Sequence, residues 1–196
     1  MKTAIKMIVV LTLITVLSGG LLASLDSITA PKIKKFRLQE LKAAIANVLP
    51  EYDYYEEIAQ GQTVLYVGKK KGQDEPVGVA FRIIGSGFQG KISIMVGIEP
   101  SFVKLTGIKV LEQVETPGLG TKIVYDPSKK SDPLWFSSQF KGRVTSPFMT
   151  VIKNVKPEKS TEIQAISGAT ITSKAVVRML NDNIKLSKEI YNKKKN

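Results

Sequence analysis

The residues best suited to chemistry are the hydroxyl groups of one short segment near the C-terminal end. The segment comes just before a helical pattern and is small and hydroxyl-rich: Ser167, Gly168, Ala169, Thr170, Ile171, Thr172 and Ser173. A helix N-terminus offers free N–H donors and the positive end of the helix dipole, so it favours phosphate. Small neighbours let the active site of another protein reach a hydroxyl here. The alternative is simple N-capping by Thr170, Thr172 or Ser173.

A second candidate is a loop that combines a carboxylate with proline and glycine. Its residues are Glu115, Thr116, Pro117, Gly118, Leu119 and Gly120. Proline fixes one backbone angle, and glycine permits positive φ and close approach of a ligand. Such a loop can present backbone N–H groups to a planar ring system or a phosphate. The alternative is an ordinary Pro-Gly turn.

A third segment, Gly85 to Gly90, matches the pattern G-x-G-x-x-G. A dinucleotide-binding fingerprint must follow a strand and open a helix. Here the residues that follow, Lys91 to Val96, have a strand pattern instead. The segment therefore predicts a glycine-rich hairpin, whose glycines would still let a flat ligand approach the backbone.

The absence of two residue types narrows the chemistry further. The chain has no Cys and no His. This excludes disulfides, iron–sulfur ligation, c-type haem attachment, Cys or His zinc sites and any nucleophile–His pair. If the protein moves electrons, an organic cofactor must carry them.

An apolar stretch near the N-terminus predicts a membrane anchor at residues 7–25. It has 19 uncharged residues and, as a helix, spans about 28 Å, close to the hydrocarbon thickness of a bilayer. The rival interpretation is a cleaved signal peptide, but neither Ala23 nor Ala30 ends a good small-x-small site. Residues 1–6 are a short tail before the anchor, and 26–36 form a basic linker.

The rest of the chain predicts an α+β domain. Helical spacing covers 37–49, and Pro50 ends that helix. Short β-rich runs at 63–67, 77–84, 91–96 and 105–110 predict an antiparallel meander. Residues 117–148 are expected to be mostly loop, with an aromatic patch at Trp135, Phe136 and Phe140. A final helix is expected from Thr172 to about Tyr191, with Val176, Leu180 and Ile184 on one face.

The chain is strongly basic, with 29 Lys and Arg against 17 Asp and Glu and a net charge of +12. This favours anionic partners such as nucleic acid, acidic lipid headgroups or an acidic protein face. Two clusters, Lys32 to Arg37 and Lys193 to Lys195, are typical of solvated charge runs. The anchor, and the lack of a basic motif interleaved with aromatic residues, argue against nucleic acid. Basic residues after the anchor lean weakly against an outside domain.

The two loop segments, in this order and spacing, resemble a known family. Ser167 to Thr170, followed by Ile171 to Ser173, resembles the flavinylation motif of FMN-binding domains, and the region from Val77 through Gly120 resembles that domain too. Within this family, the chain resembles the G subunits of Rnf complexes, which are ion-translocating ferredoxin:NAD oxidoreductases. The C subunits of the sodium-translocating NADH:quinone reductase are near neighbours. The resemblance covers nearly the whole chain.

This resemblance implies that FMN is joined to Thr170 by a phosphoester bond, made by a separate magnesium-dependent flavin transferase from FAD. Thr170 is then a modified side chain, and no catalytic residue or metal site is expected. The N–H groups of Thr172 and Ser173 are expected to reach the phosphate. Glu115 is expected to hydrogen-bond to the flavin ring or tune its potential. The implied cofactor-binding residues are Thr170, Ser167, Gly168, Ala169, Thr172, Ser173, Glu115, Thr116, Pro117, Gly118, Leu119 and Gly120.

The resemblance also implies an antiparallel sheet with flanking helices at residues 37–191, an FMN-binding domain followed by a lysine-rich tail at 192–196. The expected protein is a single-pass electron-carrier subunit of the plasma (inner) membrane, not catalytic alone. Residues 1–6 would be cytoplasmic and the flavin domain extracytoplasmic. The implied partners are other membrane subunits of a complex that moves sodium ions or protons, the flavin transferase and membrane lipid.

Two positions depart from the family pattern. Gln164 stands where the motif usually carries Asp, three residues before Ser167, and Gln113 stands where a His often precedes Glu115. Two alternatives follow. One is the same kind of flavoprotein in a quinone reductase or in another extracytoplasmic electron-transfer module. The other, of a different class, is a non-flavinylated membrane-anchored binding protein.

Overall fold

The computed structural model describes residues 2–195 and falls into two units, Met1–Lys42 and Ala43–Asn196. The first unit lies within one long helix, α1 (Lys2–Val48), which is long and apolar enough to cross a membrane. Its best 18-residue window has a mean hydropathy of 2.4, and none of that window is buried against other residues. Four hydroxyl side chains of this stretch donate to carbonyls four residues back, which satisfies them without water: Thr12, Thr15, Ser24 and Thr29.

The linker expected at 26–36 is helical in the structure, so no break separates the apolar stretch from the helix expected at 37–49. Pro31 lies inside this helix. The residues after it are mainly Lys, Arg, Leu, Gln, Glu and Ala. Because these are good helix formers, they let the helix continue past one lost hydrogen bond.

The second unit is built on a five-stranded antiparallel sheet in the order β1-β2-β3-β4-β5. The strands are β1 (Tyr54–Gln60), β2 (Thr63–Lys69), β3 (Gly78–Ser86), β4 (Lys91–Ile98) and β5 (Leu105–Gln113). The predicted meander is therefore confirmed. Strand β1 was not predicted, because its sequence, YYEEIAQ, is polar and mostly exposed at the sheet edge.

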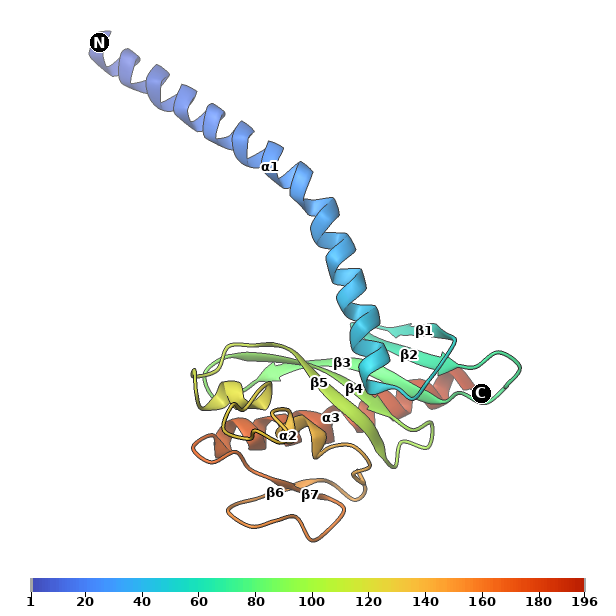
Figure 1. Cartoon of the computed structure of the whole chain (residues 1–196). Coiled ribbons are helices and arrows are strands. Elements are labelled where there is room, and N and C mark those ends of the chain that lie inside the picture. Colours follow the sequence, from blue (N-terminus) through green and yellow to red (C-terminus); the bar gives the residue numbers. More distant parts are fainter. Residues whose placement is uncertain (1, 196) are drawn as a thin grey trace. The chain divides into compact units, whose positions relative to one another are not determined.

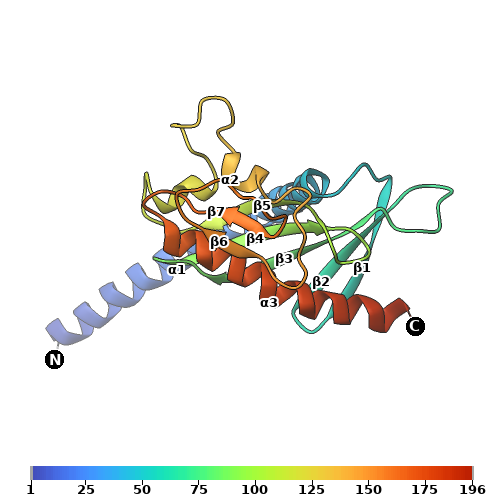
Figure 2. The same cartoon turned by 90° about the horizontal axis from the view of Figure 1, so that it is seen from below.

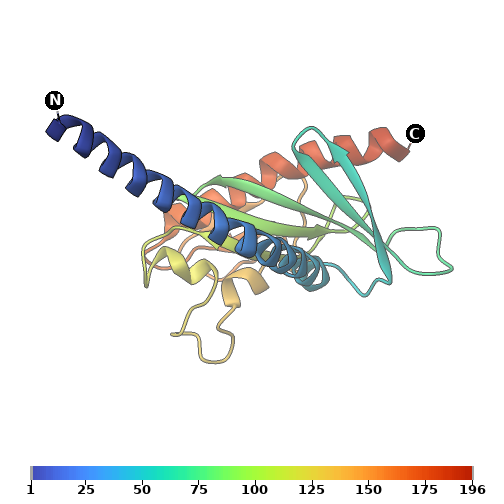
Figure 3. The ribbon, with the colours of Figure 1, turned by 90° about the horizontal axis from the view of Figure 1, so that it is seen from above.

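Helix α3 (Thr170–Lys195) lies across one face of the sheet. It lies in front of the sheet in Figure 2 and behind it in Figure 3, which views the molecule from the other side. Val176, Leu180 and Ile184 are buried as predicted, and they pack in one cluster with strand residues such as Phe81. Burying each such side chain contributes about 1.5–3 kcal/mol. This face therefore fixes where α3 begins relative to the strands.

The last turn of α1 belongs to the second unit and covers the opposite face of the sheet (Figure 1). Ala44, Ile45 and Val48 are buried there. The backbone at Val48 comes so close to Gly97 that a Cβ at Gly97 would overlap the Val48 carbonyl oxygen. Thr106 donates its hydroxyl to the same carbonyl. The second face of the sheet is thus covered in part, and Ile84 of β3 stays 52% exposed.

The segment between β5 and α3 is mostly irregular, as expected, with four short elements. These are η1 (Gly120–Ile123), α2 (Trp135–Ser138), β6 (Thr150–Ile152) and β7 (Glu162–Gln164). The predicted aromatic patch is a real part of the core, since Phe136 and Phe140 are fully buried and lie edge-to-face. Strands β6 and β7 pair in parallel, which the sequence pattern did not indicate. They bring the chain back to the start of α3.

Candidate cofactor site

At the start of α3, the hydroxyl groups of the small-residue segment differ in burial and in hydrogen bonding. Gly168 has φ of +80°, which turns the chain into the helix, and Thr170 is the first helical residue. Thr172 and Ser173 are buried and already bonded: Thr172 donates to Glu115, and Ser173 donates to the Ala169 carbonyl. None of the hydrogen bonds in the described part of the chain uses the half-buried Thr170 hydroxyl. Thr170 is therefore the accessible threonine of this segment.

The backbone donors at this helix end differ in part from the expectation. The Ser173 N–H donates to the Ala169 carbonyl at 3.0 Å, which is the first bond of the helix ladder. This N–H is therefore already occupied within the helix. The N–H groups of Thr170, Ile171 and Thr172 precede that first bond, so they are the orphan donors of the helix N-terminus.

Glu115 is a buried carboxylate that joins three segments of the chain. Its Oε1 accepts the N–H groups of Gln89 at 3.0 Å and Gly90 at 3.3 Å, both from the β3–β4 hairpin. Its Oε2 accepts the Thr172 hydroxyl at 2.5 Å, from the first turn of α3. The hairpin, the loop after β5 and the helix start therefore meet at one side chain. Both oxygens are bonded to the chain itself, which makes Glu115 a structural link.

Glycines make this meeting sterically possible. A Cβ at Gly87 would overlap Glu115 Oε1, and one at Gly120 would lie 2.7 Å from the Glu115 side chain and 3.1 Å from Thr172 Oγ1. At Gly168, a Cβ would lie 2.9 Å from Leu119. At each of these glycines a Cβ would come within 3.0 Å of a neighbouring atom, so the glycines permit the close approach of the three segments.

The three segments surround an open cavity of about 270 Å³. Its walls contain most of the predicted residues, namely Glu115, Thr116, Leu119, Gly120, Gly168, Ala169, Thr170 and Thr172. Four predicted residues, Pro117, Gly118, Ser167 and Ser173, do not line it. Two lining residues were not predicted, Phe88 and Ile171. Phe88 lies in the G-x-G-x-x-G segment, and a large apolar residue at a hairpin tip was the signal that could have revealed it.

The hairpin prediction for Gly85 to Gly90 is confirmed, because β3 and β4 pair antiparallel on either side of it. The Gly87 N–H donates to the Gly90 carbonyl at 2.7 Å and closes the turn. Thr116 donates its hydroxyl to Gln89 Oε1 at 2.8 Å, so the loop after β5 holds the same hairpin by a second bond. The segment lines the cavity with Phe88, but it does not form a dinucleotide-binding fingerprint.

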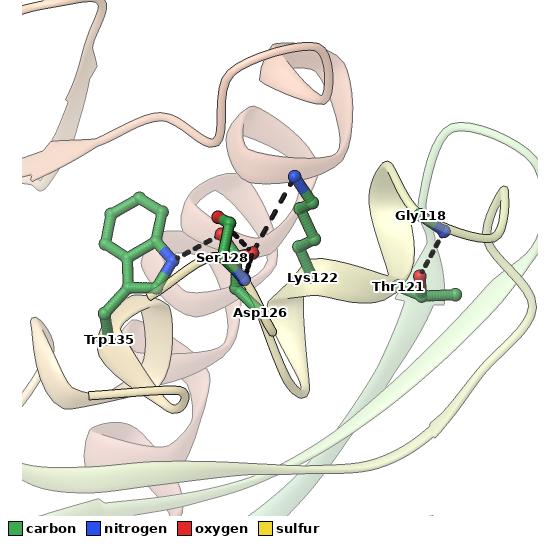
Figure 4. A network of polar contacts seen from close by, with 6 residues as sticks. All are labelled: Gly118, Thr121, Lys122, Asp126, Ser128 and Trp135. Atoms are coloured by element: carbon green, nitrogen blue, oxygen red, sulfur yellow. Dashed lines mark hydrogen bonds and ion pairs between the residues drawn. The ribbon is translucent and has the colours of Figure 1, made fainter. Parts of the chain in front are cut away.

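A second buried carboxylate, Asp126, anchors the chain that follows η1 (Figure 4). Asp126 accepts hydrogen bonds from the Ser128 hydroxyl at 2.6 Å, the Ser128 N–H at 3.0 Å and the Trp135 indole at 3.1 Å. Lys122 of η1 lies 3.7 Å from the same carboxylate. Burial alone would raise the pKa of Asp126, but these hydrogen bonds and the ammonium outweigh it and lower the pKa below the usual range. Earlier in the loop, the Gly118 N–H donates to the Thr121 hydroxyl.

The two positions that depart from the family pattern both have structural contacts. The Gln113 side chain accepts the Glu115 N–H at 2.7 Å and so steadies the entry to the loop. Gln164 is the last residue of β7, and its backbone is held by the Gln139 amide through two hydrogen bonds, at 2.8 and 3.2 Å. The main chain at Gln164 is therefore fixed by Gln139, the residue that follows α2.

The cavity suits a cofactor with a phosphate and a flat apolar part. Among the described residues that line it, Glu115 is the one with a charge, and no Lys or Arg is present. The positive end of the 26-residue helix α3 is therefore the local attraction for a phosphate. The volume is close to the lower limit of ligand pockets, about 300 Å³, so a cofactor here stays partly open to the surroundings.

Comparison with known proteins agrees with this geometry. The model of the FMN-binding domain matches residues 87–185, a range that contains the hairpin, the loop and the start of α3. The chain is 30% identical over 202 residues to the G subunit of the Na(+)-translocating ferredoxin:NAD(+) oxidoreductase complex of Acetobacterium woodii, covering 94% of this chain and 92% of that one. It is 27% identical to the G subunit of the ion-translocating oxidoreductase complex of Methanosarcina acetivorans, covering 93% and 94%.

The fold has a counterpart among solved structures. The crystal structure of NqrC from Shewanella oneidensis superposes with a TM-score of 0.56 and 24% identity, covering 74% of this chain and 68% of that one. At that identity the likeness concerns the fold alone. The sequence matches go further: the chain belongs to the FMN-binding domain family and, within it, to the G subunits of ion-translocating oxidoreductase complexes. The expected family and fold class are confirmed.

Proposed function

We propose that the chain carries FMN on Thr170 through a phosphoester bond and passes electrons within an ion-translocating ferredoxin:NAD oxidoreductase complex of the Rnf type. The observation that carries this proposal is the state of the hydroxyls at the start of α3. Thr172 and Ser173 are buried and bonded, whereas Thr170 lines the cavity and has no hydrogen-bond partner among the described residues. Bound FMN supplies the chemistry, because it exchanges one or two electrons.

A covalent bond agrees with the electrostatics of the cavity. Without Lys or Arg in the described walls, a free phosphate would be held mainly by the N–H groups and dipole of α3. The helix dipole contributes about 0.3–1 kcal/mol at an exposed site. That is too little to retain a cofactor in an open cavity. A covalent bond to Thr170 would hold the FMN without Lys or Arg side chains around its phosphate.

The attachment fits the action of a separate enzyme. In that reaction the Thr170 oxygen attacks the FMN phosphorus of FAD, a phosphoester forms, AMP leaves, and the hydroxyl proton goes to a base of the transferase. This chain has no His or Cys to serve as that base. Ser167, Gly168 and Ile171 are exposed around Thr170, so a second protein has access. We propose this flavin transferase as a transient partner.

The apolar helix α1 supports a location of the protein at a membrane. The apolar part of α1 would anchor it uncleaved in the plasma (inner) membrane, with the flavin domain on the extracytoplasmic side. Its lasting partners would then be membrane lipid and the other membrane subunits of the complex. The related chains are named for subunits of such complexes, which supports this assignment. The coupled ion would be sodium or the proton.

The test is the intact mass of the full chain, purified in detergent after co-expression with a flavin transferase. We expect a mass increase of one FMN less one water in the parent chain and none in Thr170→Ala. Ser167→Ala is the matched control, because it removes the exposed hydroxyl of the segment that does not line the cavity, and it should still be modified. Modification of Thr170→Ala would contradict the assignment.

Two other functions give different results in the same experiment. An unmodified parent would favour the binding-protein alternative, in which Gln164 in place of the usual Asp has ended flavinylation. A modified parent is also compatible with a subunit of a sodium-translocating NADH:quinone reductase, whose C subunits share the fold. Neighbouring genes for ferredoxin:NAD or for quinone reductase subunits would separate these two complexes.

A further inference from the structure

Three large apolar side chains stand exposed around the same cavity. Phe88 is 62% exposed, Ile171 59% and Leu119 44%. They come from the β3–β4 hairpin, the first turn of α3 and the loop after β5. Single exposed apolar residues are normal on a protein surface, but a group converging on one cavity indicates a binding site. These three therefore need an apolar partner.

The hairpin fixes the backbone of Phe88 and leaves its ring free. The turn is closed by the bond from the Gly87 N–H to the Gly90 carbonyl, and the N–H groups of Gln89 and Gly90 donate to Glu115. Gln89 is held a second time by the Thr116 hydroxyl. A side chain kept this exposed on a backbone held this firmly is positioned for a ligand, because the structure loses little freedom when the ring is covered.

We propose that the Phe88 ring covers one face of the isoalloxazine of the FMN attached at Thr170, with Leu119 and Ile171 against its edges. This inference rests on the proposed function. Phe88 and Thr170 line the same cavity, so a ring tethered at Thr170 lies within reach of Phe88. Aromatic rings stack in offset or edge-to-face arrangements, and the isoalloxazine is a flat apolar partner. The open side of the cavity leaves its other face for electron exchange.

The proposal gives Glu115 a different task from the one expected. Its two oxygens are bonded to the hairpin and to Thr172. Glu115 is then a positioning residue, which fixes the distance between Phe88 on the hairpin and the attachment point on α3. Direct contact with the flavin ring is left to the apolar side chains.

The test places an indole at the proposed contact. An indole in contact with an excited flavin quenches its fluorescence by electron transfer. We expect Phe88→Trp, flavinylated in the full chain, to emit several-fold less flavin fluorescence per attached FMN than the parent. Phe148→Trp is the matched control, because Phe148 is also exposed, at 58%, but does not line the cavity. Its emission should equal that of the parent, and Trp135 contributes equally to all three proteins.

The outcomes separate the two proposals. If no protein gains the FMN mass, the proposed function fails. If all three carry FMN and Phe88→Trp is as bright as Phe148→Trp, the stacking inference is overturned while the function stands. If Phe88→Trp is not flavinylated, Phe88→Leu replaces it, with quenching by iodide as the readout. Greater iodide quenching than in the parent and in Phe148→Leu supports the inference, and equal quenching overturns it.

Discussion

At the scale of single residues, two buried carboxylates, Glu115 and Asp126, fix the chain that follows β5. Glu115 fixes the beginning of the loop, and Asp126 fixes the segment after η1. Buried carboxylates are costly unless every oxygen is satisfied, and both of these are. They were not equally visible in the sequence. Glu115 stood out beside Pro117 and Gly118, whereas nothing in the sequence around Asp126 indicated that Trp135 would donate to it.

Removal of the Asp126 charge should destabilise the domain in a pH-dependent way. Its folded pKa is lowered, so its contribution to stability is present above the unfolded value of about 3.9 and is lost as pH falls through the folded pKa. Asp126→Asn should lower the free energy of unfolding at pH 7 by about 2 kcal/mol, because hydrogen bonds to a charged group are weakened. Denaturant unfolding at pH 7 and near pH 3 measures this.

The control for this prediction is Asp74→Asn, a change at an exposed carboxylate in the β2–β3 turn. Its unfolding should match that of the parent within about 0.5 kcal/mol at both values of pH. The difference between Asp126→Asn and the parent should shrink at the lower pH. A difference of the same size at both values would show that packing, and not the charge, is what Asp126 contributes.

At the scale of elements, the site is a meeting of a hairpin, a loop and a helix start. The sheet register places the β3–β4 turn beside the end of β5, since Ile92 pairs with Gln113. The apolar face of α3 sets the position of its N-terminus against that edge. Glu115 then ties the three elements together. The site therefore depends on the relative placement of elements more than on any one of them.

Loss of the Glu115 side chain should loosen all three elements at once. Glu115→Ala leaves the N–H groups of Gln89 and Gly90 and the Thr172 hydroxyl without their acceptor. The Thr172 hydroxyl is buried, and a buried unsatisfied group costs about 1–3 kcal/mol, whereas the N–H groups of Gln89 and Gly90 are more open to water. We therefore expect a loss of about 2 kcal/mol in the free energy of unfolding. Hydrogen exchange should also become faster at the hairpin tip and at the first turn of α3.

Glu112→Ala is the matched control in the same region. Glu112 lies on β5, is exposed, and its described ion pair is with Arg82 at 3.1 Å. Exposed ion pairs contribute at most about 1 kcal/mol, so this variant should unfold close to the parent and keep its exchange pattern. If the two variants lose equal stability, the linking role assigned to Glu115 is wrong.

At the scale of the whole molecule, the chain divides into an apolar helix and a domain with its own core. The buried residues of the core run from Ala44 to Tyr191, all within the second unit. The apolar window of α1 buries none of its surface against the rest of the chain. The stability of the second unit therefore comes from its own core, to which the apolar window of α1 does not contribute.

A chain lacking residues 1–42 should fold without the anchor. We expect it to be soluble after lysis, with a melting temperature within a few degrees of the full chain, because no core side chain is removed. The full chain should stay with the membrane fraction after an alkaline carbonate wash. Fractionation followed by circular dichroism of both proteins measures this. A truncated chain that aggregates unfolded would contradict the independence of the domain.

The sequence alone determined the features that depend on the composition of neighbouring residues and on the spacing of apolar residues along the chain. The apolar run of 7–25, the alternating strands, the face of Val176, Leu180 and Ile184, and the lack of Cys and His are properties of neighbouring residues. The hydroxyl-rich segment and the Pro-Gly loop were also visible, because small residues and glycines mark unusual backbone. The parallel pair β6–β7 and the polar edge strand β1 were not visible in the sequence, since neither shows a strong alternation of apolar and polar residues.

Only the tertiary structure decided which of these residues act together. It buried and bonded the Thr172 and Ser173 hydroxyls and left that of Thr170 without a partner among the described residues, because burial and bonding depend on what packs against a helix start. It turned the Glu115 carboxylate toward the hairpin and Thr172, and it brought Phe88 from a distant turn to the cavity. Those contacts join residues 25 to 57 positions apart. Separations of that size are fixed by strand register and helix packing, which local sequence does not record.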